Sequence, residues 1–237
     1  LCDGKDIFFF FFEYRRILGY LPQEFGFYPE FSVHDYLMYI ASIKGMRISI
    51  ARKRVTELLR QVGLAKMQNR KMKKLSGGMK RRAGIAQAML NNPKILILDE
   101  PTAGLDPNER IRFRNLISEL SQDRLVLLST HIVSDIEYIA NQVLLMKDGK
   151  ISHSGTQEEI IQSVPVKVWS CVVANNEVEM WQKQFKVSNM KTLSDGIELR
   201  ILSEKSPHYN AKEETMTLED IFLYYFGEKT GDDYDVL

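Results

Sequence analysis

Two short apolar runs, each closed by polar residues, constrain the fold more than any other feature of this sequence. "KILILDE" covers residues 94–100, "RLVLLSTH" covers residues 124–131, and a helix-like segment separates them. Continuous apolar runs of strand length, without alternation, are typical of strands buried on both faces of a parallel sheet. Strands that alternate with helices predict an α/β fold, with polar groups placed at the strand ends.

Local capping signals mark helices around these strands. Ser32 is a good N-cap for a helix that stops at Gly45, and a second amphipathic helix follows it. A third helix begins near Ser76. Asp106 followed by Pro107 is an N-cap with proline at the first helical position, which predicts a further helix to about residue 122.

Composition changes after residues 164–165. We therefore predict a main domain over residues 1–164, with a helical subdomain over about residues 32–92, and a small α+β appendage over residues 165–237. Near the end of the main domain, a hairpin is expected to turn at Asp148-Gly149.

Charge and cysteine content exclude several classes of protein. The 237 residues include 32 Lys and Arg against 31 Asp and Glu, so no global field draws the chain to nucleic acid or to an anionic membrane. Two cysteines are too few for a disulfide framework, which favours a reducing, intracellular compartment. The apolar run at residues 7–12 is only about a third of the length that spans a bilayer, so this run is not expected to cross a membrane.

Asp99 and Glu100 end the first apolar run, where open α/β sheets bind their ligands. An aspartate there can hold Mg²⁺, usually through waters, and the adjacent glutamate can orient and deprotonate an attacking water. Taken alone, the pair is equally compatible with acids that merely terminate a strand.

"LSGG" at residues 75–78 is a second candidate site. Ser76 can cap a helix whose free N–H groups face outward, while Gly77 and Gly78 let a phosphate approach the backbone. For this tetrapeptide alone, an ordinary N-cap after a Gly-rich turn is the more common explanation.

In this order and at these spacings, "YLPQ", "LSGGMKRR", "ILILDEPTAGLDP" and "LLSTH" resemble the nucleotide-binding domain of ABC (ATP-binding cassette) transporters. The resemblance is close from Gly4 to about Gly155, and "TLEDIFLYY" resembles the C-terminal tail of ATPases that serve ABC-2-type exporters. It implies a P-loop NTPase-like parallel sheet flanked by helices, incomplete at the N-terminus, with ATP and Mg²⁺ as cofactors.

The resemblance also implies a role for each motif. It implies catalytic residues Glu100, His131 and Gln23, cofactor-binding residues Ser76, Gly77, Gly78 and Asp106, and metal ligands Asp99 and Gln23. In the family, the serine and glycines contact ATP held by the opposite subunit of a head-to-tail dimer, and the Asp106 position lies along the same interface.

The implied partners are a second ATP-binding subunit, identical or different, and a transmembrane permease. Phe25, Phe27 and Tyr28 are candidate contacts with the permease, and a plain packing role is equally compatible with them. The expected location is cytoplasmic, peripheral on the inner face of the cell membrane. No nucleic-acid partner is expected, because no aromatic residues interleave the basic segments 70–74 and 80–82.

Two departures from the family pattern concern its nucleotide site. Met79 and Arg81 replace common glutamines. No G-x-x-x-x-G-K-[ST] phosphate loop occurs, since the Gly-Lys pairs at residues 4–5 and 149–150 lack both the following hydroxyl residue and the upstream glycine. We expect a fragment of an intact ATPase, inactive alone. The alternatives are a non-hydrolysing partner that donates only its LSGG face and a non-transport ABC protein.

The run from Phe8 to Phe12 falls, by the same resemblance, in a connection that is normally polar and at the surface. Five phenylalanines there would form an exposed, aggregation-prone segment with no chemical role. We interpret the run as a local sequence anomaly.

Overall fold

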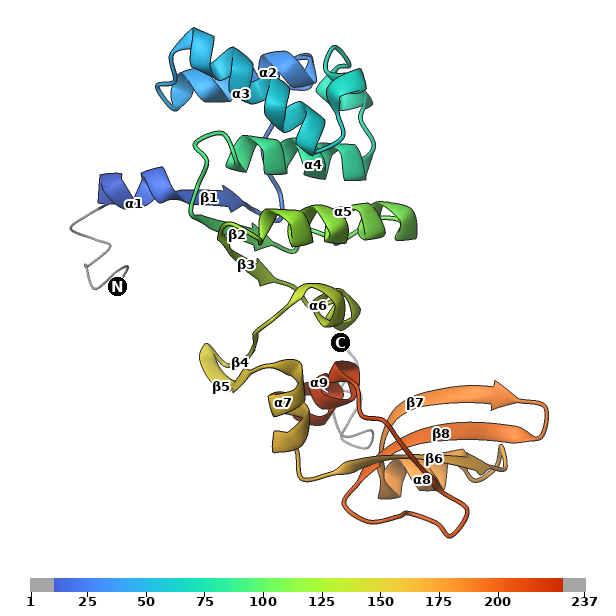
Figure 1. Cartoon of the computed structure of the whole chain (residues 1–237). Coiled ribbons are helices and arrows are strands. Elements are labelled where there is room, and N and C mark those ends of the chain that lie inside the picture. Colours follow the sequence, from blue (N-terminus) through green and yellow to red (C-terminus); the bar gives the residue numbers. More distant parts are fainter. Residues whose placement is uncertain (1–10, 228–237) are drawn as a thin grey trace, which may run out of the picture. The chain divides into compact units, whose positions relative to one another are not determined.

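The computed structural model describes residues 11–227 (Figure 1). The predictions that fall on Gly4, Lys5 and Phe8 to Phe10 lie outside the described residues. The chain divides into two compact units, residues 1–135 and 136–237. The domain boundary predicted from composition at residues 164–165 stays a prediction. Within the described part, no helix is both long enough and apolar enough to cross a membrane.

A small parallel sheet organises the first unit. Its strands lie in the order β1 (Leu18–Leu21), β2 (Ile95–Asp99) and β3 (Leu125–Ser129), and α1 (Phe11–Ile17) leads into the first of them. Both strand pairs are parallel, with Leu21 beside Leu98 and Asp99 beside Ser129. The parallel sheet with flanking helices confirms the predicted α/β class, and it brings the carboxyl ends of all three strands to one edge (Figure 1).

In the described part of the first unit, four further helices surround this sheet or lie beyond it. They are α2 (Val33–Ile43), α3 (Ile48–Gln61), α4 (Gly77–Ala88) and α5 (Pro107–Leu120), with the 3-10 turns η1 (Ala65–Met67) and η2 (Met72–Lys74) between α3 and α4. The short helix α6 (Val133–Ile139) spans the boundary between the two units. The predicted caps form, because Ser32 and Asp106 each accept a hydrogen bond from the third residue of their helix. Gly45 and Gly63 follow α2 and α3 with φ of +73° and +68°, a conformation that favours glycine.

The two faces of the sheet differ in burial. Leu96 and Leu98 are fully buried on the face that α4 and α5 cover (Figure 1). On the opposite face Tyr20, Leu125 and Leu127 are 48%, 63% and 47% exposed. The expectation that residues 124–131 form a strand buried on both faces is therefore wrong, because no described element covers this second face of β3.

Glycine allows α4 to approach β1 closely. A Cβ added at Gly19 would lie 2.6 Å from the carbonyl oxygen of Ala88, and one added at Gly84 would lie 2.6 Å from Cδ1 of Leu21. The strand backbone at Gly19 thus packs against the helix backbone, and the helix backbone at Gly84 packs against the Leu21 side chain. The helix that carries "LSGG" and the strand that leads to Gln23 are therefore held together.

The second unit contains a hairpin and a four-stranded antiparallel sheet. The hairpin strands β4 (Val143–Lys147) and β5 (Lys150–Gly155) precede α7 (Gln157–Ser163). Asp148 and Gly149 turn between them with φ of +49° and +73°, as the sequence predicts. The sheet order is β7-β8-β6-β9, with β6 (Lys167–Val173), β7 (Lys186–Leu193), β8 (Gly196–Ser203) and β9 (Lys212–Glu214).

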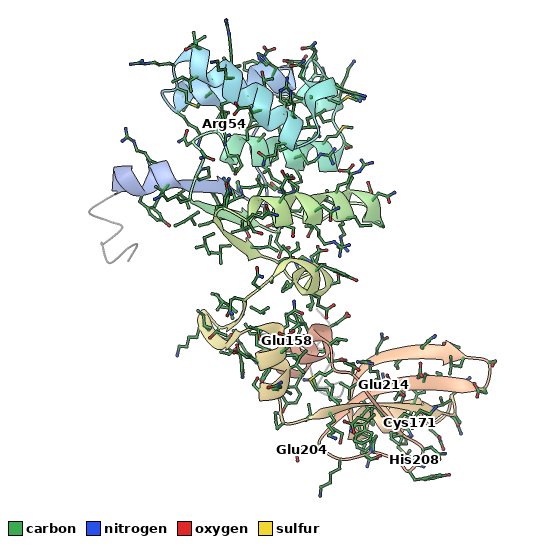
Figure 2. All side chains as sticks on the ribbon, in the orientation of Figure 1. Arg54, Glu158, Cys171, Glu204, His208 and Glu214 are labelled. Atoms are coloured by element: carbon green, nitrogen blue, oxygen red, sulfur yellow. The ribbon has the colours of Figure 1, made fainter. Side chains whose placement is uncertain are left out.

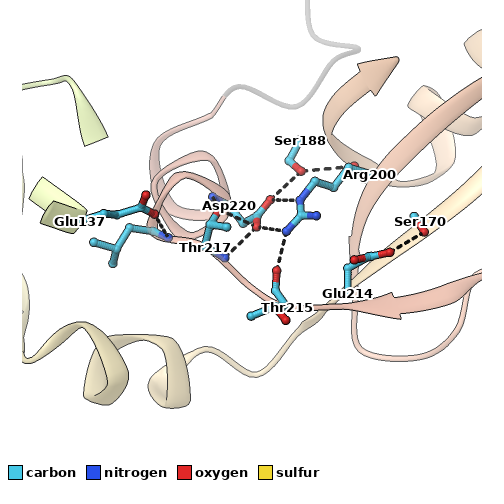
Figure 3. Close-up of polar contacts among 9 residues, drawn as sticks. Glu137, Ser170, Ser188, Arg200, Glu214, Thr215, Thr217 and Asp220 are labelled. Carbon is cyan, nitrogen blue, oxygen red and sulfur yellow. Dashed lines mark hydrogen bonds and ion pairs between the residues drawn. The ribbon is translucent and has the colours of Figure 1, made fainter. Parts of the chain in front are cut away.

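An apolar cluster and an ionic cluster stabilise this second unit. Cys171, labelled in Figure 2, is 3% exposed and packs in the apolar cluster, against which Trp169 and Trp181 lie. Trp181 belongs to α8 (Val178–Gln184). The ionic cluster centres on Asp220 in α9 (Leu218–Phe226), whose carboxylate accepts two hydrogen bonds from Arg200 on β8 (Figure 3).

Candidate functional site

The strand ends of β2 and β3 hold a set of polar side chains that we call the carboxylate edge: Asp99, Glu100, Ser129, Thr130 and His131. The parallel register sets Asp99 beside Ser129, whose hydroxyl donates to Asp99 Oδ1 at 2.6 Å. The backbone N–H of Glu100 donates to the carbonyl of Ser129 at 2.9 Å. Pairing between the strands therefore brings together residues that lie about thirty positions apart.

Glu100 is held by His131 within this edge. Its Oε1 accepts the backbone N–H of His131 at 3.0 Å and lies 2.8 Å from the ring Nδ1. The hydroxyl of Thr130 reaches Oε2 at 3.3 Å. The Glu100 side chain is 17% exposed and that of His131 is 68% exposed. The carboxylate is thus fixed beside a histidine that remains open to solvent.

The backbone of Glu100 is in an unusual conformation. Its φ of +43° lies in the left-handed region, which few residues other than glycine adopt. Residues in such conformations cost about 1–3 kcal/mol each and cluster at functional sites. A strained backbone therefore marks Glu100 independently of any motif.

The oxygen ligands offered by Asp99 and Gln23 are compatible with Mg²⁺. The described residues contain no group of three or more His, Cys, Asp or Glu that could hold a metal ion. In nucleotide sites, however, Mg²⁺ is usually bound through one or two carboxylates together with phosphate oxygens. Asp99 is half-buried and Gln23 is exposed just beyond β1, so both present the oxygen ligands that this cation prefers.

Arg81 is a charged neighbour of this edge, which the sequence marks only as a departure from the family pattern and as part of the basic segment 80–82. It donates from Nη1 to the carbonyl of Pro22 at 3.2 Å, which ties α4 to the segment carrying Gln23. Burial lowers the pKa of Arg81, while the charges of Glu24, Asp99 and Glu100 act in the opposite direction. A positive charge is thus placed near the acids at the strand ends.

The "LSGG" residues form the first turn of α4, which we call the signature turn: Ser76, Gly77 and Gly78. The Ser76 hydroxyl accepts the N–H of Met79 at 3.2 Å, as predicted for an N-cap. Gly77 is exposed, and a Cβ added there would have no neighbour within 4 Å. Gly78 is buried, and an added Cβ would clash with Oε2 of Glu109. The two glycines therefore differ, because only Gly77 is open to a ligand.

Asp106 begins α5 and uses its side chain as a cap. Its Oδ1 accepts the N–H of Glu109 at 2.9 Å, and the residue is exposed. The predicted site residues therefore fall into two groups. Asp99, Glu100 and His131 lie at the carboxylate edge, with Gln23 beyond the neighbouring strand, whereas the signature turn and Asp106 lie at the starts of α4 and α5.

Sequence reasoning missed the contacts that join this second group. Glu109 receives hydrogen bonds from Arg82 and from Arg112, the latter at 3.0 Å. The only local signal in the sequence was an acidic residue in the first turn of a helix, which is common at helix starts.

The Gly149-Lys150 pair lies in the turn of the β4-β5 hairpin, so it does not form a phosphate loop.

Comparison with known proteins gives a consistent set of matches. The family model described as "ABC transporter" matches residues 2–103. The uncharacterized ABC transporter ATP-binding protein YxlF of Bacillus subtilis strain 168 is 36% identical over 170 residues, which are 72% of this chain and 57% of that protein. The linearmycin resistance ATP-binding protein LnrL of the same organism is 32% identical over 147 residues, 62% of this chain and 47% of that protein.

Solved structures agree with these matches. An ATP-binding subunit of an ABC transporter superposes with a TM-score of 0.57 and 27% identity, covering 68% of this chain and 67% of that one. The protein cbiO1 of Clostridium perfringens, part of the ABC transporter complex cbiONQ, gives a TM-score of 0.57 at 28% identity, covering 63% of this chain and 61% of that one. The chain spans about half the length of the curated relatives it matches.

Proposed function

Because this chain carries an ATPase domain of the ABC transporter family, we propose that it acts in the ATP-hydrolysing subunit of a transporter. The observation that supports this most directly is the contact between Glu100 Oε1 and His131 Nδ1 at 2.8 Å, beside Asp99 at the ends of parallel strands. Transport would follow from ATP-driven association of two such subunits beneath a membrane permease. The cargo and the direction of transport are properties of that permease.

Glu100 is the proposed general base. Its Oε1 is engaged by two donors of His131, whereas Oε2 accepts only the long bond from Thr130 at 3.3 Å. A carboxylate offers about four acceptor positions, so Oε2 retains capacity to accept the proton of an attacking water. Phosphoryl transfer depends mainly on positioning and charge stabilisation, and a carboxylate already fixed by three donors supplies the positioning.

His131 and the metal ligands complete the proposed chemistry. Asp99 and Gln23 would hold Mg²⁺, which when bound neutralises charge on the phosphates. When both ring nitrogens of His131 carry a proton, Nδ1 donates to Glu100 and the second nitrogen, on an exposed ring, can donate to the terminal phosphate. The same ring of His131 would therefore orient the base and contact the terminal phosphate.

The signature turn and Asp106 are proposed to contact a second subunit. Ser76 and Gly77 are exposed at the N-terminus of α4, where free N–H groups and the helix dipole favour an anion. Asp106 is exposed at the start of α5. These three residues would meet ATP or backbone of the partner, whether that partner is identical or different.

The membrane partner is proposed to dock on the segment after Gln23. Phe25 and Phe27 lie 6.0 Å apart, and the ammonium of Lys80 lies 5.2 Å from the Phe27 ring, so these two rings also have packing partners. Tyr28 also packs, against Phe31 and Tyr39 with ring centroids 5.0 and 5.1 Å apart, but it is 48% exposed and is therefore the better candidate contact. A permease contact here would place the chain on the cytoplasmic side, peripheral to the membrane.

The substitution Glu100→Gln tests this function in the complete gene product. It keeps the size of the side chain but removes its capacity to accept a proton, so ATP turnover should fall by about two orders of magnitude or more. ATP should also trap a stable dimer, detected by size-exclusion chromatography with light scattering. Glu57→Gln, at an exposed position on α3, is the matched control and should leave turnover unchanged. Unaltered turnover in Glu100→Gln would refute the assignment of Glu100 as the base.

A further inference from the structure

Glu109 connects the starts of two helices that carry proposed interface residues. It is the third residue of α5, and its backbone N–H donates to Asp106 Oδ1 at 2.9 Å. Its carboxylate accepts hydrogen bonds from Arg82 of α4 and from Arg112 of its own helix. One residue is thus bonded both to Asp106 and to the helix that begins with the signature turn.

The carboxylate of Glu109 also lies directly on the signature turn. A Cβ added to Gly78 would clash with Oε2 of Glu109 and would lie 2.8 Å from its Cγ. No side chain larger than that of glycine fits there while Glu109 keeps its position. A side chain at Gly78 would therefore displace the Glu109 carboxylate, whereas Gly77 has open space beside its backbone.

Electrostatics favours this arrangement from both sides. Gly78 and Arg82 are four residues apart in α4, so they present the backbone and the guanidinium on one face of the helix. The N-terminal turn of α4 carries the positive end of the helix dipole, which attracts the same carboxylate. The Arg82 and Glu109 side chains are only 9% and 12% exposed, so water screens their attraction weakly.

We propose that Glu109 is a positioning residue that holds the signature turn and Asp106 as one rigid surface for the second subunit. This inference rests on the proposed function. The signature turn and Asp106, at the starts of two separate helices, would each lose conformational entropy when the dimer closes. A shared buried carboxylate removes part of that loss before the partner arrives, so Glu109 promotes dimerisation without touching the nucleotide.

The test compares two forms of the complete gene product. One carries Glu100→Gln alone and serves as the reference, and the other carries both Glu100→Gln and Glu109→Gln. We expect the concentration needed for ATP-dependent dimerisation to rise at least about tenfold, equivalent to ~1.4 kcal/mol. ATP affinity of the monomer should change less than about twofold, because Glu109 makes no proposed nucleotide contact. The matched control adds Glu119→Gln, at an exposed position on the same helix, to the Glu100→Gln protein. It should dimerise at the same concentration as the reference.

Hydrogen exchange provides a readout that needs no ATP. Loss of the contact between Glu109 and Arg82 should raise the rate of amide exchange in residues 77–79 and in residues 106–110 together. Should Glu109→Gln fail to fold, Arg82→Lys carries the same test, because it keeps the charge but loses the guanidinium geometry.

Three results would overturn the proposal. They are unchanged dimerisation, an equal loss of monomer ATP affinity, and faster exchange confined to residues 106–110. If the reference protein itself shows no ATP-dependent dimer, the proposed function fails, and the exchange data alone then decide whether Glu109 couples the two helices.

Discussion

Asp220 of the second unit offers the sharpest test of how this chain is stabilised. Its Oδ1 accepts hydrogen bonds from Ser188 and from Arg200 Nε, both at 2.9 Å. Its Oδ2 accepts from Arg200 Nη2 at 2.7 Å and from the hydroxyl and N–H of Thr217 at 2.8 and 2.9 Å (Figure 3). The substitution Asp220→Ala removes all of these contacts while leaving their donors in place.

The expected loss follows from burial and from capping. The Asp220 side chain is 3% exposed and that of Arg200 is 26% exposed. Breaking a fully buried ion pair costs about 3–5 kcal/mol, and the partial exposure of Arg200 lets water recover some of it. Loss of a helix cap costs about 1 kcal/mol. We therefore expect Asp220→Ala to lower the free energy of unfolding of this unit by about 3 kcal/mol.

Tryptophan fluorescence during urea denaturation measures this loss selectively. The sequence holds two tryptophans, Trp169 and Trp181, and both lie against the apolar cluster of the second unit. The transition should move to lower urea with an unchanged slope. Glu179→Gln is the matched control, because its pair with Lys183 is exposed and such pairs contribute about 0–1 kcal/mol.

The same carboxylate predicts a pH dependence. Burial alone would raise the pKa of Asp220, but the hydrogen bonds from Arg200, Thr217 and Ser188 outweigh it, and the pKa is lowered. The stabilisation is therefore present above the unfolded-state pKa of about 3.9 and is lost as pH falls through the lower folded-state value. Asp220→Asn should flatten the dependence of stability on pH in that acidic range. A shift in Asp220→Ala no larger than in Glu179→Gln would refute the whole argument.

Two further predictions concern the first unit and are measured by circular dichroism during thermal unfolding. Tyr36→Phe should cost about 1 kcal/mol, because the buried hydroxyl contacts Gln87 and, at 3.2 Å, the carbonyl of Gly26. Burial raises the pKa of Tyr36 to about 12, so a spectrophotometric titration should lose its most alkaline step in this variant, and an unaltered titration would contradict the assignment. Gly84→Ala should destabilise by about 1–2 kcal/mol, since overpacking against Leu21 outweighs the better helix propensity of alanine. Gly26→Ala, where an added Cβ meets nothing within 4 Å, should be close to neutral, and equal effects at the two positions would contradict the packing argument.

Local signals predicted much of this fold. The Asp106-Pro107 pair begins α5, and the run at residues 94–100 contains β2. Such signals act within a few residues, so they can be read directly from sequence. The strand β7 (Lys186–Leu193) carries no such signal, because its polar residues become a strand through pairing with β8.

The candidate site was predictable only as far as its motifs. Asp99, Glu100 and His131 stand at strand ends, so a parallel sheet alone brings them to one edge. The contact of Arg82 with Glu109 joins residues 27 positions apart, and no local pattern specifies which acid an arginine will meet. The exposed face of β3 was missed for a related reason, because the apolar content of a strand does not reveal which elements cover it. The roles proposed for the site residues stay predictions.

The left-handed backbone at Glu100 has a consequence for how this chain tolerates change. A non-glycine residue at φ of +43° costs roughly 1–2 kcal/mol relative to a relaxed conformation, and glycine would remove that cost. Backbone strain alone would therefore favour glycine at position 100, whereas the carboxylate makes the hydrogen bonds to His131 and Thr130 and is required by the proposed chemistry. Backbone strain and the role of the side chain are thus in conflict at this position, so a variant selected for thermal stability that carries glycine here should have lost ATP turnover.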